Sequence, residues 1–184
     1  MKTLIVVDVE ADGPCPGLYS MVCFGAVAVE PTLAKTFYGQ TSPLYEYIDG
    51  LGGGSWEPID YQEKALVVSG FTRDQHLSFP EPQVAINNFD LWLAQFEQPI
   101  FVSDNVAFDW QFINYYFHRF GPKGNPFGWS GRRIGDMYGG MKGDLRAQWK
   151  QLRITKHTHN PVDDAMGNAE ALLKMAELGL KGIL

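Results

Sequence analysis

The sequence predicts one α/β domain over residues 1–184, and three observations lead to this prediction. Residues 4–7 are four consecutive aliphatic side chains, which is typical of a strand buried on both faces of a central sheet. Residues 82–96 and 106–120 instead repeat apolar side chains at helical spacing. The chain of 184 residues is 45% hydrophobic and 20% charged, an ordinary globular composition with length enough for one sizeable core.

The first half of the chain is expected to form strands before it forms helices. Strands at 4–7, 20–29 and 36–41 predict an antiparallel meander, because a turn separates the last two. We interpret the glycine-rich segment 49–54 as a loop, since no lysine of the phosphate-loop pattern follows it. The next predicted elements are helices at 61–68 and 82–96.

The second half predicts two strands and three helices. A short strand at 99–102 leads into the helix at 106–120, for which Asn105 is a suitable N-cap. We expect a short fifth strand at 133–134 and a helix near 142–152. The last helix is predicted at 161–178, with Asn160 as its N-cap and proline at its first position.

The charge distribution is uneven. The chain has a net charge of −6, which argues against a broad coat for nucleic acid. Residues 132–157 nevertheless carry seven basic and two acidic side chains, a local charge of +5. This segment suits a short polyanionic substrate, although an exposed helix face would have the same composition.

Two further features concern the cellular compartment. We find no apolar run of membrane-spanning length and no signal-peptide pattern, so we expect a cytoplasmic protein that does not enter a membrane. Cys15 and Cys23 are too few for a disulfide framework, and we expect both thiols to be reduced.

Two acids follow the first aliphatic run. Asp8 and Glu10 have period-2 spacing, so they lie on the same face at the end of the strand. Burial and mutual repulsion oppose their ionisation, and a divalent cation such as Mg²⁺ or Mn²⁺ would remove that cost. The alternative is a strand that ends in a solvated acidic turn.

Further acids lie in the first turns of the last two long helices. Asp163 has a structural explanation, because an acid at the third helical position completes a capping box with Asn160. Asp164 lies instead on a small and apolar stripe that suits packing on the sheet, so its carboxylate needs a partner there. Asp109 has the alternative explanation of favourable interaction with the helix dipole.

Three motifs connect these residues: D-x-E at Asp8 and Glu10, N-x-x-x-D at Asn105 and Asp109, and H-x-x-x-x-D at His159 and Asp164. In this order they resemble the DEDD exonucleases, and the histidine is that of the DEDDh branch. That branch includes ribonuclease T, oligoribonuclease and the proofreading subunits of replicative polymerases. The resemblance covers almost the whole chain, because residues 65–72 and 133–136 also look like segments of the family.

The resemblance implies a ribonuclease H-like fold, with a mixed five-stranded sheet in the order 3-2-1-4-5 flanked by helices. It implies two divalent cations, Mg²⁺ or Mn²⁺, held by Asp8, Glu10, Asp109 and Asp164. His159 would be the general base for the attacking water. The reaction would release nucleoside 5′-monophosphates from a 3′ end.

Substrate contacts are expected beside these motifs. We select Gly13, Asn105 and Phe108 as substrate-binding residues. His157 lies off the motif spacing, so we expect it to stand outside the site. Stacking on single strands is the expected mode of base recognition, and the aromatic candidates for it are Tyr19, Phe24, Phe71, Phe108, Phe112 and Trp129.

Two residues depart from the family pattern. Asp12 and Asp104 are expected to add negative charge near the substrate groove, which leaves the substrate class open. We favour an exoribonuclease acting on single-stranded 3′ ends, because small single-domain members often trim RNA. The alternatives are a 3′–5′ DNA exonuclease and a catalytically weak nucleic-acid-binding module. A homodimer is expected by analogy with the branch.

Overall fold

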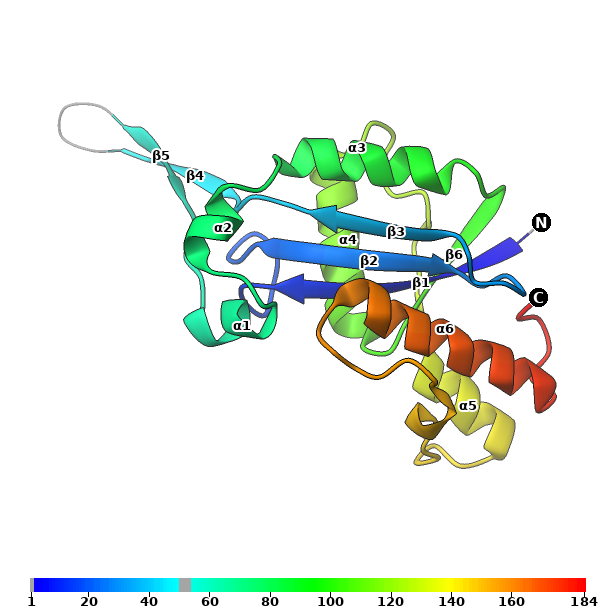
Figure 1. Ribbon diagram of the computed structural model, residues 1–184. Helices are drawn as coiled ribbons and strands as arrows, with labels where there is room; N and C mark the ends of the chain where they lie inside the picture. The colour runs from blue at the N-terminus through cyan, green and yellow to red at the C-terminus, as the bar shows by residue number, and fades with distance from the viewer. Residues whose placement is uncertain (1, 50–53) are drawn as a thin grey trace.

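The computed structural model describes residues 2–49 and 54–184, so most of the predicted loop at 49–54 lies outside the described residues. A five-stranded sheet in the order β3-β2-β1-β6-β7 forms the centre of the molecule (Figure 1). This order matches the expected 3-2-1-4-5, because β4 and β5 form a separate hairpin. The sheet strands are β1 (Lys2–Ala11), β2 (Met21–Ala28), β3 (Thr36–Gln40), β6 (Gln98–Ser103) and β7 (Arg132–Arg133).

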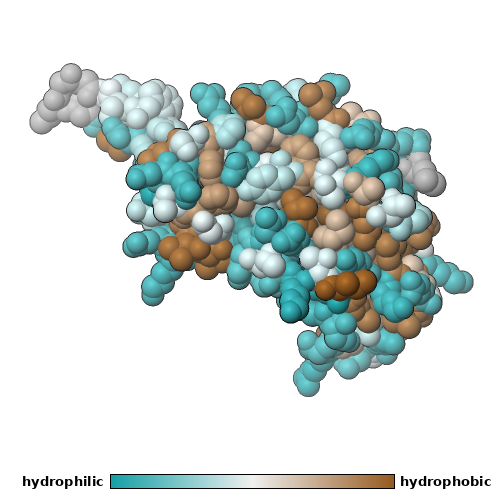
Figure 2. Space-filling model, in the orientation of Figure 1, coloured by the Kyte–Doolittle hydropathy of each residue, from teal (hydrophilic) through white to brown (hydrophobic). Residues whose placement is uncertain are grey.

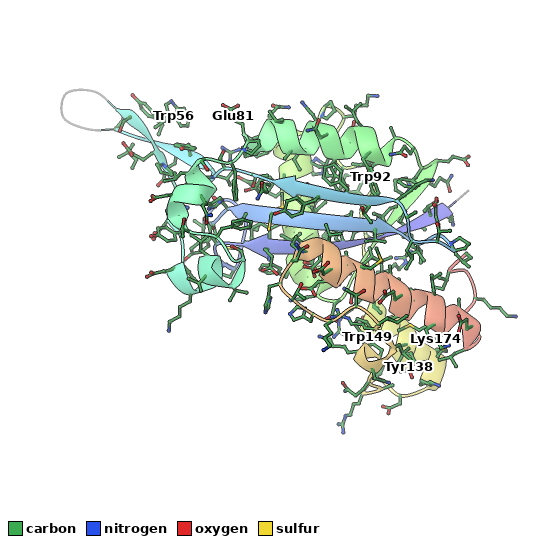
Figure 3. The ribbon with its side chains drawn as sticks, in the orientation of Figure 1. Trp56, Glu81, Trp92, Tyr138, Trp149 and Lys174 are labelled. Carbon is green, nitrogen blue, oxygen red and sulfur yellow. The ribbon has the colours of Figure 1, made fainter. Side chains whose placement is uncertain are left out.

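Helices cover both faces of the sheet (Figure 1). The two faces of β1 supply two cores: Ile5 and Val7 pack with α3 (Pro82–Leu93) and α4 (Val106–Phe120). Leu4 and Val6 pack with α5 (Ile134–Lys142) and α6 (Pro161–Glu177), and this second core includes Tyr138 and Trp149 (Figure 3). The aliphatic run is therefore buried on both faces, as predicted.

The structure corrects the prediction around residues 133–152. The fifth strand is Arg132–Arg133, and the helix that follows is α5 rather than a helix near 142–152. Gly143 has a φ of +66°, the left-handed conformation that ends α5 at its C-cap. Beyond it, only the 3₁₀ turn η1 (Lys150–Leu152) is helical in this stretch.

Four small elements join β3 to α3. The hairpin of β4 (Tyr45–Ile48) and β5 (Ser55–Pro58) was not predicted, and it projects from the body with Trp56 exposed (Figures 1 and 3). The predicted helix at 61–68 is α1 (Glu63–Val68), and the unpredicted α2 (Arg73–Leu77) begins with a capping box. Among the described residues no helix has the length and apolar character to cross a membrane.

The sheet and α6 meet closely at one glycine. Gly25 on β2 pairs with Asp8 on β1. A Cβ added to Gly25 would lie 2.4 Å from the backbone carbonyl carbon of Pro161, at the first turn of α6. Only glycine allows this contact, and the contact places the N-terminal turn of α6 beside the acids of β1.

Candidate active site

Three carboxylates from the two ends of the chain meet at the end of β1. One oxygen each of Asp8, Glu10 and Asp164 lies within 4.8 Å of the others. The alternation of β1 brings the first two to one face, and the α6 stripe brings Asp164 to them. Asp164 is only 1% exposed, which agrees with its predicted place on the buried side of the helix.

The loop before α6 holds Asp164 in place. The backbone amides of Thr158 and His159 each donate to its carboxylate at 3.0 Å. Asn160 caps the helix as predicted, accepting from the amides of Val162 and Asp163. The predicted capping box between Asn160 and Asp163 was wrong. The Asp163 carboxylate accepts a hydrogen bond from the Thr158 hydroxyl at 3.0 Å instead of one from the Asn160 amide.

Asp109 lies beside the three acids, in the first turn of α4. It is 3% exposed, and its carboxylate accepts a 3.1 Å hydrogen bond from the backbone amide of Val9. This bond ties α4 to β1 between Asp8 and Glu10. Asn105 is the N-cap position of α4, but its side chain makes no capping hydrogen bond.

The electrostatics of the cluster favour a bound cation. Burial, and then the charges of Asp109 and Asp164, raise the pKa of Asp8 well above its usual range. Burial, and then Asp164 and Asp109, raise the pKa of Glu10 to about 8. Burial raises the pKa of Asp109 to about 7. Carboxylates so placed ionise fully only with a counter-charge, so their oxygens fit a hard divalent cation.

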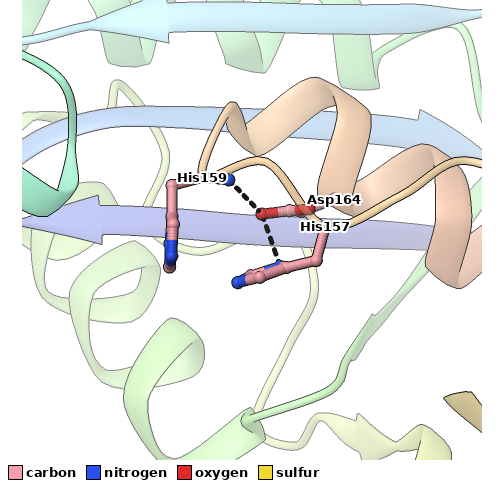
Figure 4. A group of neighbouring side chains, drawn as sticks. All are labelled: His157, His159 and Asp164. Carbon is pink, nitrogen blue, oxygen red and sulfur yellow. Dashed lines mark hydrogen bonds and ion pairs between the residues drawn. The ribbon is translucent and has the colours of Figure 1, made fainter.

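Two histidines lie beside Asp164 (Figure 4). His159 Nδ1 lies 3.5 Å from Glu10 Oε1, and His159 has a φ of +62°, which is uncommon outside glycine. His157, expected to stand outside the site, lies with Nδ1 2.8 Å from Asp164 Oδ2. The two imidazole centroids are 4.3 Å apart. The H-x-H spacing was the sequence signal for this pair, because alternate residues of an extended segment share a face.

Comparisons with known proteins place the chain in a family, although no family model matches it. The chain is 33% identical over 177 residues to the 3′-5′ DNA exonuclease Cap18 of Escherichia coli, covering 93% of this chain and 84% of that protein. The chain belongs to the DEDDh branch of the DEDD 3′–5′ exonucleases.

Solved structures of three nucleases share the fold of this chain. Cell-death related nuclease 4 aligns with a TM-score of 0.73 at 15% identity, over 97% of this chain and 65% of that one. The nuclease domain of 3′hExo, a DEDDh member bound to rAMP, aligns with a TM-score of 0.68 at 17% identity, over 97% and 94%. E. coli exonuclease I in complex with a dT13 oligonucleotide aligns with a TM-score of 0.63 at 18% identity, over 97% of this chain and 41% of that one. The chain therefore spans less than two thirds of the first and third of these proteins.

Two hollows border the candidate site of this DEDDh chain, one beside Glu10 and one beside His159. One of about 320 Å³ is lined by Glu10, Gly13 and Phe108 among others, so two of the three expected substrate contacts share it. The other, of about 190 Å³, includes His159. Val68 of α1 lines both, and Figure 2 shows an apolar patch over α1, where Val67 and Val68 are exposed. Asn105 is among the lining residues of neither hollow.

The aromatic candidates divide by burial. Phe24 and Phe112 are wholly buried and belong to the core, so the prediction that they stack on bases was wrong. Phe71 packs edge-to-face on Phe79 at 4.9 Å. Trp129 is 91% exposed, and Phe108 is partly exposed at the hollow it shares with Glu10. Tyr19 covers Gly13, where an added Cβ would lie 2.1 Å from the ring.

The two departures from the DEDDh pattern do not add free charge to the groove. Asp12 is fully buried and bonds the guanidinium of Arg73 at 3.1 Å and the amide of Ser20 at 2.5 Å. Asp104 pairs with Lys150 at 2.7 Å. Each acid therefore has its own counter-charge, so neither adds the unpaired negative charge that was expected near the groove.

The basic segment is partly engaged within the DEDDh chain itself. Arg133 pairs with Asp136 at 2.8 Å, and Lys150 is held by Asp104. Arg153 donates to Asn168, and its charge lowers the pKa of Asp8, against the larger effect of burial. The local charge of +5 therefore overstates what the segment offers to a substrate.

Proposed function

We propose that this protein is a metal-dependent 3′–5′ exonuclease that removes nucleoside 5′-monophosphates from single-stranded 3′ ends. The observation that carries the proposal is the convergence of Asp8, Glu10 and Asp164 within 4.8 Å, with Asp109 and His159 beside them. A nucleic-acid-binding module has no use for a buried cluster of acids that a cation must neutralise.

The metal ligands in this proposal are Asp8, Glu10, Asp109 and Asp164, and the ions are two Mg²⁺ or Mn²⁺. Such a pair, when bound, stabilises the attacking and the leaving oxygens of a phosphodiester. The raised pKa values of Asp8, Glu10 and Asp109 support a cation at these acids, because each carboxyl then ionises without the cost of repulsion.

His159 is the proposed general base. Its side chain is half exposed and lies 3.5 Å from Glu10, so it is near the acids and open to water. An imidazole exchanges protons near neutral pH, and a positioned base contributes about 10²–10⁴-fold to a rate. The protein otherwise supplies position, through the β1 strand end, the α4 start and the loop before α6.

Single-stranded DNA is the proposed preferred substrate, because Cap18 at 33% identity is named a DNA exonuclease. RNA is the second candidate, since one protein of related fold is described as bound to rAMP and another as recognising the 3′ end of a histone mRNA stem-loop. The exposed side chain of Val68, which lines both hollows, suits the flat face of a base and does not distinguish ribose from deoxyribose. A homodimer stays a prediction by analogy, which sedimentation velocity tests.

Matched DNA and RNA oligomers, labelled at either end, test this function with Mg²⁺ or Mn²⁺. We expect the 3′ label to leave at once as a mononucleotide and the 5′ label to pass through a ladder of shortening products. A 3′-phosphate should block the reaction. The control is Asp164→Asn, which should be inactive. Internal cleavage, or tight binding by the wild type without any cleavage, would contradict the proposal.

A further inference from the structure

We propose that His157, His159 and Asp164 form a second metal site, for Zn²⁺ or a similar transition metal, beside the carboxylate site. One ligand atom of each residue lies within 4.8 Å of the other two. Asp164 belongs both to this group and to the group of Asp8 and Glu10. The two sites therefore adjoin and share one carboxylate. Figure 4 shows the three side chains of the histidine site.

The loop before α6 pre-organises this group. The amides of Thr158 and His159 hold the buried Asp164 carboxylate at 3.0 Å, so the loop wraps around it. The φ of +62° at His159 maintains that path, and uncommon backbone conformations of this kind cluster at functional sites. As a result His157 Nδ1 lies 2.8 Å from the anchored Asp164 oxygen, and an imidazole nitrogen of His159 lies within 4.8 Å of an Asp164 oxygen.

The remaining adjustment is small. Zinc–nitrogen and zinc–oxygen bonds of about 2.0–2.1 Å in a tetrahedron place ligand atoms about 3.3 Å apart. The separations between the three ligand atoms, now at most 4.8 Å, need to shrink by at most about 1.5 Å. The side chains of His157 and His159 are 53% and 50% exposed, so both can rotate and one position stays open to water.

The donor sets distinguish the two sites. Asp8, Glu10 and Asp164 offer only oxygen, which suits Mg²⁺ or Mn²⁺. His157 and His159 add two imidazole nitrogens, which suit Zn²⁺ and its transition-metal neighbours and which Mg²⁺ avoids. A metal held there also engages the His159 imidazole. Zinc is then an inhibitor, and this consequence alone rests on the proposed function.

The competing explanation is that His157 only orients Asp164 through its hydrogen bond. Cobalt absorption separates the two, because Co²⁺ with four mixed nitrogen and oxygen ligands absorbs visible light strongly and octahedral Co²⁺ with oxygen ligands does so weakly. The experiment uses untagged full-length protein in excess Mg²⁺. The variants are His157→Gln and His159→Gln, and the control is the exposed His118→Gln, which lies outside the group.

We expect the strong band in the wild type and in His118→Gln, and its loss in both other variants. Zinc affinity, measured against a chromophoric chelator, should fall at least about 10-fold in His157→Gln, the loss that even an outer-shell partner causes. A wild type with only the weak spectrum overturns the site. An unchanged band or unchanged zinc affinity in His157→Gln does the same.

Inhibition supplies the functional readout. The zinc concentration that halves each variant's own zinc-free activity should rise at least about 10-fold in His157→Gln and stay constant in His118→Gln. If no exonuclease activity is found, the cobalt spectrum still decides the metal site, so failure of one proposal is distinguishable from failure of the other. Equal zinc sensitivity of wild type and His157→Gln overturns the inhibitory role.

Discussion

Replacing Asp8 by asparagine should make the metal-free protein more stable while it abolishes activity. Asp8 has one oxygen within 4.8 Å of Glu10 and Asp164, and Asp109 adds a further charge nearby. Asparagine keeps the shape of the side chain and removes its charge. The substitution therefore relieves repulsion that only a cation relieves in the wild type.

The magnitude follows from the geometry. Two unit charges at that 4.8 Å limit repel by about 3.5 kcal/mol at an effective dielectric constant near 20. Part of this repulsion is already avoided, because the raised pKa of Asp8 favours its protonated form. We expect a net gain of about 2 kcal/mol at pH 8, or roughly 4–8 °C in Tm for a protein of this size.

The pH dependence has a defined sign. The pKa of Glu10 at about 8 and of Asp109 at about 7 are above the ordinary carboxyl values, so the folded protein holds protons that the unfolded chain has released. The contribution of these two carboxyl groups to the stability of the metal-free wild type is therefore fully present below the ordinary carboxyl pKa and is lost as pH rises through 7 and 8. The advantage of Asp8→Asn should shrink as pH falls toward 5.

Calorimetry of wild type and Asp8→Asn in chelator, at pH 5 and pH 8, measures this effect. The control is Asp74→Asn, an exposed acid outside the cluster, which should shift stability by less than about 0.5 kcal/mol. Adding Mg²⁺ at about 100 times its Kd should stabilise the wild type by about 2.7 kcal/mol and Asp8→Asn far less. The reasoning is refuted if Asp8→Asn is less stable than the wild type at pH 8. It is also refuted if the stability difference between the two proteins is as large at pH 5 as at pH 8.

Three further predictions follow from the site. Gly25→Ala should push the start of α6 away from β1 and cost about 10²-fold in kcat. The control Gly140→Ala, with open space around the added methyl group, should be as active as wild type. Equal activity of both variants would show that the contact between Gly25 and Pro161 does not position the site. His159→Ala should lose about 10²–10⁴-fold in kcat and keep the Mg²⁺-induced rise in Tm; loss of that rise would make His159 a ligand of the catalytic metal. Removing the charges of Arg132 and Lys156 together should raise KM. It should also reduce the slope of log binding constant against log salt concentration, for single strands, by about 1.4. An unchanged slope would show that neither side chain contacts the substrate.

The features that local pattern determines were predictable from the sequence. The run of residues 4–7 has no polar side chain, so only a strand covered on both faces buries it, and the structure has that strand. The α6 stripe and its Asn160 cap were predicted for the same reason, since helical spacing and capping are local. The order of the strands in the sheet was predicted from the family resemblance alone, because the periodicity of apolar residues does not reveal which strands pair.

The features that depend on distant contacts were not predictable. Asp12 is adjacent to the motif in sequence, yet Arg73 from another element neutralises it. His157 misses the motif spacing, yet the fold of its loop brings it onto Asp164. The helix α5 contains three glycines, which conceal a helical pattern, and its end is set by the backbone of Gly143.

The most direct test of the central claim is product analysis after thorough removal of metal. The four acids and His159 are proposed to hydrolyse the terminal phosphodiester only with a divalent cation present. Mass spectrometry of a single-stranded oligomer should find no product in chelator, and nucleoside 5′-monophosphates alone once Mg²⁺ or Mn²⁺ is restored. Undiminished cleavage in excess chelator, or release of 3′-monophosphates, would contradict the account.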